Sequence, residues 1–298
     1  MIDGLVNFNL DEVSPTIIKV IGVGGGGGNA VEYMYSKGIC DVDFVVCNTD
    51  AQTLENSPVP LKIQLGKKLT EGHGAGNDPF QGARSAEESL EEIKEMLRRN
   101  TKMAFITAAM GGGTGTGAAP VIARLTKEMD ILTVGIVSIP ARFEGPKRLN
   151  QAREGLRLLK DNVDCLIVID NEKIKKIYGS QTISAAFAKA NDVLNIAAKG
   201  IAEIITLPGY INVDFADVKT VMTNSGVAIM GAAQASGEDR AKRAITEALD
   251  SPLLNNNDIR GAKDILLNIT SGTNEVTMNE MTEITLSLIH ISEPTRPY

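Results

Sequence analysis

Residues 110–117 read Met-Gly-Gly-Gly-Thr-Gly-Thr-Gly, and this run is the strongest indication of the fold class. An apolar, strand-like segment over 103–109 precedes it, and a helix-like segment over 118–128 follows it. Glycines lack the Cβ atoms that would hold a ligand away from the backbone, so successive N–H groups can point at one anion in front of a helix N-terminus. The run contains no lysine and is therefore not a G-x-x-x-x-G-K-[ST] loop. We expect it to hold a phosphate group through backbone amides.

A second glycine run, Gly24–Gly28, stands between the strand-like residues 16–23 and a helix that we expect to open at Asn29. It also satisfies the dinucleotide fingerprint G-x-G-x-x-G from Gly22 onward, although five consecutive glycines match many patterns by chance. Two alternatives stay open for this run alone. One is a tight turn that binds nothing, and the other is an NAD-dependent oxidoreductase with Asp50 near the ribose. The presence of two phosphate-type loops in one domain favours a nucleotide-binding protein.

Composition and charge narrow the class of protein. The 298 residues carry 30 Lys and Arg against 37 Asp and Glu, a net charge of −7, and no basic stripe that would indicate a nucleic-acid partner. The three cysteines and two histidines show neither metal-ligand spacing nor a disulfide framework. The N-terminal residues lack the pattern of a signal peptide, and no apolar run reaches the length of a membrane span. We therefore expect a cytoplasmic protein without direct membrane insertion.

Apolar strand-like runs alternate with helical segments along the first two thirds of the chain. This alternation predicts an α/β fold with a doubly wound, mostly parallel sheet, whose ligands bind beyond the carboxyl ends of the strands. The turn-rich segment 56–80 reads as one long loop, and residues 181–206 read as one long helix that ends before Pro208. The predicted strands are 16–23, 42–48, 103–109, 131–139 and 163–170.

A second, smaller unit follows the long helix. Its pattern predicts a helix near 215–224, a strand near 226–234, a helix near 239–249, a strand near 263–270 and a helix near 277–286. Residues 287–298 do not continue this pattern, and we expect them to be a non-native tail, such as a fusion scar or a translated adapter.

Several motifs in a fixed order resemble the FtsZ family, the tubulin-like GTPases of bacterial cell division. They are Gly24–Asn29, Asn48-Thr-Asp50, Gly111–Gly117, Phe143-Glu-Gly145 with Arg148, Asn171, Asp192 and Asn212-Val-Asp-Phe-Ala-Asp217. The resemblance runs from about residue 16 to about residue 286. It implies GTP hydrolysis activated by head-to-tail self-assembly into the filaments of the septal ring. Other division proteins would be recruited through a C-terminal peptide that this chain lacks.

The resemblance implies a GTP-binding domain over 16–180, a connecting core helix over 181–208 and a partial α+β C-terminal domain over 209–286. We expect an N-terminal arm over 1–15 before them and the tail over 287–298 after them. We expect the C-terminal domain to be truncated.

The resemblance also assigns roles in binding GTP or GDP. Both glycine runs would hold the phosphates, and Glu144 and Arg148 would lie beside the ribose and phosphates. Asn171 would contact the guanine, and the Asp192 carboxylate would accept its N1–H and N2–H₂ donors while rejecting adenine. Read without the resemblance, these four are a surface ion pair, a loop or N-cap asparagine and a solvated helix residue. The phosphate set is Gly25, Gly26, Gly27, Gly28, Asn29, Gly112, Gly113, Thr114, Gly115, Thr116 and Gly117.

Three residues after the long helix would carry the chemistry. In the family, the loop that contains Asn212, Asp214 and Asp217 enters the nucleotide site of the adjacent subunit and polarises the attacking water, with Mg²⁺ held mainly through phosphates and water rather than by protein ligands. Read from the sequence alone, either aspartate is an N-cap or first-turn acid of the following helix. A nucleotide-binding scaffold that does not hydrolyse GTP is then the alternative.

Overall fold

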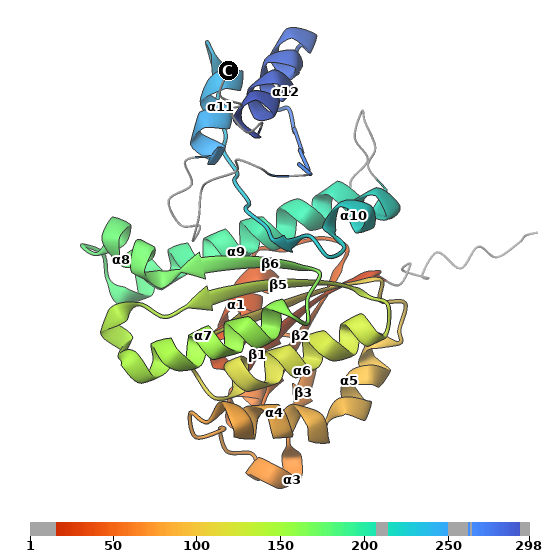
Figure 1. Ribbon diagram of the computed structural model, residues 1–298, viewed down its shortest axis with the longest axis vertical. Helices are drawn as coiled ribbons and strands as arrows, with labels where there is room; N and C mark the ends of the chain where they lie inside the picture. The colour runs from red at the N-terminus through yellow and green to blue at the C-terminus, as the bar shows by residue number, and fades with distance from the viewer. Residues whose placement is uncertain (1–15, 207–213, 250–261, 263, 293–298) are drawn as a thin grey trace, which may run out of the picture.

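The computed structural model describes residues 16–206, 214–249, 262 and 264–292. Seven parallel strands form one sheet in the order β3-β2-β1-β4-β5-β6-β7 (Figure 1). Because β1 pairs with β2 on one side and with β4 on the other, the strand order reverses between β1 and β4. The strands are β1 (Ile18–Val23), β2 (Val42–Asn48), β3 (Leu61–Gln64), β4 (Met103–Ala109), β5 (Leu132–Ile139), β6 (Cys165–Asp170) and β7 (Gly226–Val227).

Helices cover both faces of this sheet, which confirms the predicted doubly wound α/β architecture. Helices α1 (Gly24–Ser36), α9 (Ile183–Thr206) and α10 (Phe215–Met222) pack on one face. Helices α4 (Pro79–Glu88), α5 (Leu90–Leu97), α6 (Thr114–Glu128) and α7 (Pro146–Lys160) pack on the other. The remaining helices are α2 (Ala51–Asn56), α3 (Lys67–Thr70), the 3₁₀ turn η1 (Arg142–Glu144), α8 (Asn171–Tyr178), α11 (Arg240–Leu249) and α12 (Met278–Ser292).

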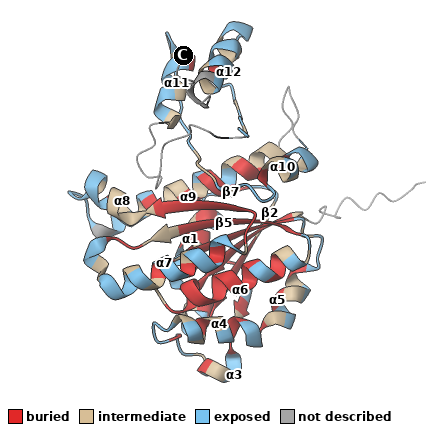
Figure 2. Cartoon of the chain, viewed as in Figure 1, coloured by how far each residue is buried: buried red, intermediate tan, exposed pale blue. Residues whose placement is uncertain are grey.

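The core consists of two apolar layers, one on each side of the sheet (Figure 2). On β1, Ile18 and Val20 belong to the layer under α1 and α9, whereas Ile21 and Val23 belong to the layer under α6. Successive side chains of a strand point to opposite faces, so a strand buried on both faces is apolar throughout. This explains why the central strands were recognisable in the sequence as continuous apolar runs.

Both helices that follow the glycine runs begin earlier than the sequence predicts. Helix α1 starts at Gly24 rather than Asn29, and α6 starts at Thr114 rather than Ala118. The glycines themselves therefore form the first helical turn, where the backbone N–H groups have no partner within the helix. Glycine has a low helix propensity, and the packing against the neighbouring strands overrides it here.

The prediction of one long loop over residues 56–80 is wrong. This segment contains the edge strand β3 and the short helix α3. Strand β3 pairs in parallel with β2, where Leu61 lies opposite Val45. Of its four residues only Ile63 is buried, so the sequence shows no periodic pattern that would reveal the strand.

The strands predicted in the second unit are wrong for the described residues. Of the strand expected near 226–234, only β7 forms, and it pairs with β6 as the last strand of the first sheet. Residues 264–270 form no strand, because an extended segment without a neighbouring strand leaves its N–H and C=O groups unpaired. The last two helices predicted in this unit do form, as α11 and α12. The Arg240 guanidinium of α11 contacts the Glu280 carboxylate of α12, with 2.6 Å from Nε to Oε1.

Helix α12 also continues past the predicted boundary at residue 286 and ends at Ser292. Residues 287–292 are therefore helical, and residues 293–298 lie outside the described part of the chain. The non-native origin of 287–298 stays a prediction, as does the division of the chain into five segments.

Candidate nucleotide site

The two glycine runs lie side by side at the carboxyl edge of the sheet, where the strand order reverses. One follows β1 and the other follows β4, and these strands are hydrogen-bonded neighbours. Ligands of open α/β sheets bind in the crevice at such a reversal point. The structure therefore brings together the two loops that the sequence singled out.

Close approach of the two loops depends on residues without side chains. A Cβ placed on Gly26 would lie 2.3 Å from the Ala109 Cβ, and one placed on Gly115 would lie 2.8 Å from the Ala109 carbonyl oxygen. Real Cβ atoms do not tolerate such contacts, so these glycines let the starts of α1 and α6 pack against the end of β4. Other positions differ, because a Cβ would meet no atom within 4 Å at Gly25, Gly28 or Gly112.

Hydroxyl groups hold the second loop in place. The Gly111 N–H donates to the Thr116 hydroxyl at 2.8 Å, and the Thr114 and Thr49 hydroxyls lie 2.9 Å apart. The second contact brings the Asn48-Thr49-Asp50 segment, which follows β2, to the loop that follows β4. Asp50 caps α2 by accepting a hydrogen bond from the Thr53 N–H at 3.0 Å. Three strand ends therefore contribute to one site.

Glu144 and Arg148 form the surface ion pair that the sequence also allowed. The Arg148 Nη1 atom lies 3.1 Å from Glu144 Oε2, and the other Glu144 oxygen accepts the Ala141 N–H at 2.9 Å. The first turn of α7 nevertheless lies against the second glycine loop, since a Cβ on Gly111 would lie 3.0 Å from the Arg148 carbonyl oxygen. The Glu144 carboxylate is therefore bound within its own turn, and the Arg148 backbone lies at the edge of the site.

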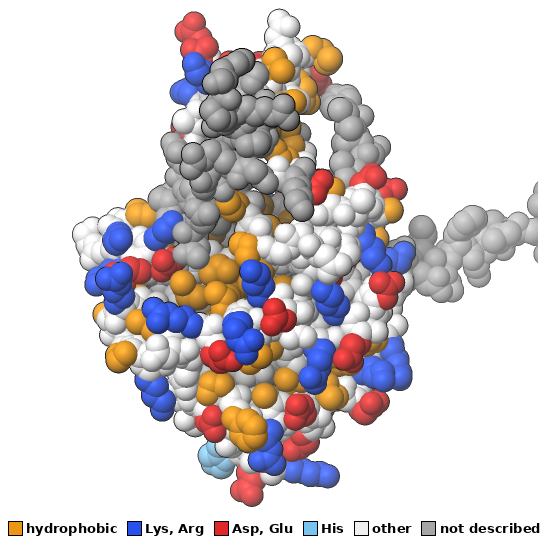
Figure 3. All heavy atoms as spheres, viewed as in Figure 1, with side chains coloured by type: hydrophobic (Ala, Val, Ile, Leu, Met, Phe, Trp, Pro, Cys, Tyr) orange, Lys and Arg blue, Asp and Glu red, His pale blue; other side chains and the backbone are white. Residues whose placement is uncertain are grey.

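Basic side chains outnumber acidic ones in the segments at one side of this edge. Figure 3 shows lysine and arginine side chains gathered over the end of the sheet where α7 begins and α8 lies. In a chain of net charge −7, such a local excess favours an anionic ligand at this edge. The basic residues of η1 and of these two helices include Arg142, Lys147, Arg148, Lys173, Lys175 and Lys176.

Asn171 is the first residue of α8 and does not cap it. The cap is Asp170, whose carboxylate accepts the Glu172 N–H at 2.9 Å. The Asn171 Oδ1 atom is buried and has no hydrogen-bond partner among the described residues. Buried polar atoms are nearly always satisfied, and a ligand group at the carboxyl edge of β6 would give this oxygen a partner.

Asp192 lies on α9 and contacts α1. Its Oδ1 atom accepts a hydrogen bond from the Tyr33 hydroxyl, and its Oδ2 atom lies 3.5 Å from the Lys189 ammonium. Tyr33 was not among the residues that the sequence singled out. The pairing of residues 33 and 192 depends on how two helices pack, and nothing local in the sequence signals it.

Asp214 and Asp217 form a reciprocal cap at the start of α10. The Asp217 N–H donates to Asp214 Oδ1 at 2.9 Å, and the Asp214 N–H donates to Asp217 Oδ2 at 3.2 Å. Both aspartates are exposed. The capping role that the sequence allowed is therefore present, and Asn212 lies outside the described residues.

The two aspartates lie at the opposite edge of the sheet from the glycine loops. The Lys219 ammonium of α10 is 3.1 Å from the Asp130 carboxylate, which stands just before β5 begins. The glycine loops, in contrast, follow the carboxyl ends of β1 and β4. Strand β5 has eight residues and spans roughly 26 Å. Within one chain, the structure does not bring these acids to the glycine loops.

Neither a metal-ligand cluster nor a reactive thiol is built into this site. Among the described residues, no group of three or more His, Cys, Asp or Glu side chains is placed to hold a metal ion. Cys47 and Cys165 are free and buried, and burial raises the pKa of their thiols to about 12 and about 11. These cysteines are core residues, as expected.

Of the described helices, none is long and apolar enough to cross a bilayer.

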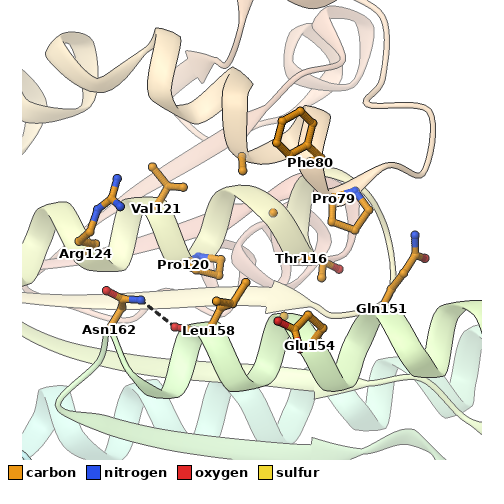
Figure 4. A pocket seen from close by; sticks show the side chains of 13 residues that line it. Pro79, Phe80, Thr116, Pro120, Val121, Arg124, Gln151, Glu154, Leu158 and Asn162 are labelled. Atoms are coloured by element: carbon orange, nitrogen blue, oxygen red, sulfur yellow. Dashed lines mark hydrogen bonds between the residues drawn. The ribbon is translucent and has the colours of Figure 1, made fainter.

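A pocket of about 430 Å³ lies beside the site, between α4, α6 and α7 (Figure 4). It runs along the sides of helices rather than over the strand ends, and Phe80, Pro120, Val121 and Leu158 give it a mainly apolar lining. Its mainly apolar lining does not suit a phosphorylated ligand, so the ends of β1 and β4 at the glycine loops are the better candidate for a nucleotide site.

Comparison with known families agrees with this geometry. Residues 17–179 match the model of the tubulin/FtsZ family GTPase domain. The chain belongs to the tubulin/FtsZ family. Residues 226–295 match the C-terminal domain of the FtsZ family. The FtsZ assignment therefore covers both the sheet domain and the helices α11 and α12.

Individual relatives support the assignment. The chain is 52% identical over 277 residues to the cell division protein FtsZ of Porphyromonas gingivalis, and 51% identical over 268 residues to that of Coxiella burnetii. These alignments cover 92% and 89% of this chain, but 61% and 69% of the two relatives. A solved structure described as an empty FtsZ dimer from M. jannaschii superposes with a TM-score of 0.82 at 42% identity, over 94% of this chain and 80% of that one.

Proposed function

We propose that this chain binds and hydrolyses GTP, and that it polymerises head to tail into the filaments of the bacterial septal ring. The observation that carries the proposal is the separation of two half-sites on one sheet. A cradle of two glycine loops lies at the carboxyl edge, and the Asp214–Asp217 pair lies at the opposite edge. Each half is incomplete alone, and stacking a second copy of the chain would complete it.

Binding would use the residues that the structure gathers at the carboxyl edge. Backbone N–H groups at the starts of α1 and α6 would hold the phosphates, and the basic residues around α7 and α8 would attract them. Asn171 and Asp192 would face the guanine, since one has an orphaned oxygen and the other a carboxylate. Mg²⁺ fits this site only through phosphates and water, because the described residues contain no ligand cluster of their own.

Hydrolysis would take place between two subunits. The Asp214 and Asp217 carboxylates of one copy would polarise a water against the terminal phosphate bound by the next, and Mg²⁺ would neutralise charge on the phosphates. A contact that joins one edge of the molecule to the other is heterologous and propagates as an open filament. The main partner would then be a second copy of the chain. From its likeness to cell division proteins, we further propose that it acts in the cytoplasm at the division site with other division proteins.

Two other functions account for fewer of these features. An NAD-dependent oxidoreductase would use only the first glycine run, and the Asp50 carboxylate that would hold the ribose already caps α2. A scaffold that does not hydrolyse GTP is compatible with the capping box, because that box gives both aspartates a structural role.

Phosphate release from GTP, measured against protein concentration, distinguishes these functions. A site shared between subunits predicts that specific activity rises with concentration and then levels off. Specific activity independent of concentration would place catalysis within one chain. Tight GTP binding without phosphate release at any concentration would support the scaffold.

A further inference from the structure

A hydrogen bond from Tyr33 connects helix α1, which begins with the first glycine run, to Asp192 on α9. Helix α1 begins at Gly24 in the phosphate cradle and carries Tyr33 nine residues later, roughly 14 Å along its axis. There the Tyr33 hydroxyl donates a hydrogen bond to Asp192 Oδ1 on α9. One helix therefore reaches both the phosphate end and the base end of the proposed GTP site.

The surroundings of this contact restrict both side chains. The Lys37 ammonium lies over the face of the Tyr33 ring, 5.0 Å from its centroid. The Lys189 ammonium lies 3.5 Å from Asp192 Oδ2. Tyr33 is half-buried, and the Asp192 side chain is 33% exposed. A partly solvated aspartate can turn about its last bond unless a partner holds it, and Tyr33 is a partner from a different helix.

Base recognition needs such an orientation. Guanine presents two parallel donors, N1–H and N2–H₂, so both carboxylate oxygens must face the base at once. An ionised carboxylate has about four acceptor positions. The Tyr33 hydroxyl occupies one position on Oδ1, which leaves acceptor positions on both oxygens for the base. Holding the group beforehand removes part of the ordering cost of binding.

We propose that Tyr33 is a positioning residue for guanine selectivity, which holds the Asp192 carboxylate in the orientation that accepts both guanine donors. This inference rests on the proposed function, because it assumes that Asp192 faces the base. It goes further by assigning the selectivity to a pair of residues on two helices rather than to Asp192 alone.

The test compares Tyr33→Phe with Tyr35→Phe in the full chain. The first substitution removes only the hydroxyl that contacts Asp192. The matched control removes a hydroxyl two residues along the same helix, from a ring that packs edge-on against Phe44 at 5.7 Å. Dissociation constants are measured by competition for GTP, for ITP, which lacks the N2 amino group, and for ATP. Thermal unfolding is recorded for each variant.

Tyr33→Phe should weaken GTP binding by up to about tenfold, because ordering one freed side chain on binding costs about 0.5–1.5 kcal/mol. ITP and ATP binding should change less, so the preference for GTP over both should fall, whereas Tyr35→Phe should match the wild type. In a chain that already carries Asp192→Ala, adding Tyr33→Phe should cause no further loss, because the two residues act as a unit.

Three results would overturn the proposal: unchanged or tighter GTP binding in Tyr33→Phe, an equal loss for all three nucleotides, or the same loss with and without Asp192. An equal loss together with a lower melting temperature would show that the hydroxyl only joins α1 to α9. A wild-type chain that binds ATP as well as GTP would contradict the proposed function itself. A wild-type preference for GTP that Tyr33→Phe keeps would contradict only the role of Tyr33.

Discussion

The glycines of the two loops have two different roles, which single substitutions can separate. Gly115→Ser would place a side chain against the Ala109 and Val23 carbonyl oxygens, at 2.8 and 3.2 Å, so we expect it to destabilise the fold by about 1–3 kcal/mol as well as to weaken GTP binding. Gly112→Ser would project into open space and should weaken GTP binding at an unchanged melting temperature. Thermal unfolding and nucleotide titration of both variants test this.

The two glycine variants also locate the ligand. Full GTP affinity in Gly112→Ser would show that the phosphates do not lie in front of that residue. A Gly115→Ser protein as stable as the wild type would contradict the packing role of that glycine.

At the scale of elements, helix α10 combines a cap with a predicted catalytic group, and one substitution can remove the second while keeping the first. Asparagine caps helices about as well as aspartate, whereas alanine costs about 1 kcal/mol. Asp214→Asn should therefore leave the melting temperature and GTP affinity unchanged while most hydrolysis is lost, and Asp214→Ala should lower both stability and hydrolysis. Phosphate release and thermal unfolding give the comparison. Wild-type turnover in Asp214→Asn would leave α10 with a structural role only.

The contact between α11 and α12 should depend on pH. Hydrogen bonds from the Arg240 guanidinium, and then from Thr277, lower the Glu280 pKa from 4.5 to about 2. Because the folded pKa lies below the unfolded one, the contribution of this carboxylate to stability is present above about pH 4.5 and is lost as the pH falls toward 2. The protection of the α12 amides against exchange, relative to the intrinsic exchange rate at each pH, should therefore fall over that range.

Glu280→Gln is the control for this titration. It keeps the size of the side chain but removes the charge, so the α12 amides should be less protected at neutral pH, and their protection should no longer fall with acid. The same acid-dependent loss of protection in Glu280→Gln would mean that another group controls the pairing of the two helices.

At the scale of the whole molecule, the two half-sites lie at opposite edges of one sheet, so two impaired chains should complement each other. Gly112→Ser has an intact acid pair and an impaired cradle, and Asp214→Asn has the reverse. Mixing them should restore part of the phosphate release, since one kind of contact in the mixture joins an intact cradle to an intact acid pair. Each variant at the same total concentration is the control. A mixture no more active than its components would argue against a shared site.

The sequence by itself determined the parallel sheet and the place of the two glycine loops. Buried parallel strands are apolar along their whole length, and a glycine run between a strand and a helix is typical of a phosphate loop, so both features are local and readable. The long helix α9 and the cap at α10 were readable for the same reason, through helical periodicity and an acid at the first turn.

Tertiary structure alone decided how these pieces meet. The starts of α1 and α6 depend on packing against Ala109, the short strands β3 and β7 exist only through their neighbours β2 and β6, and residues 264–270 lack a strand partner. The contact of Tyr33 with Asp192 and the separation of the acid pair from the cradle join residues far apart in the chain. Such contacts leave no periodic trace in a sequence, because they depend on which surfaces pack together once the whole chain has folded.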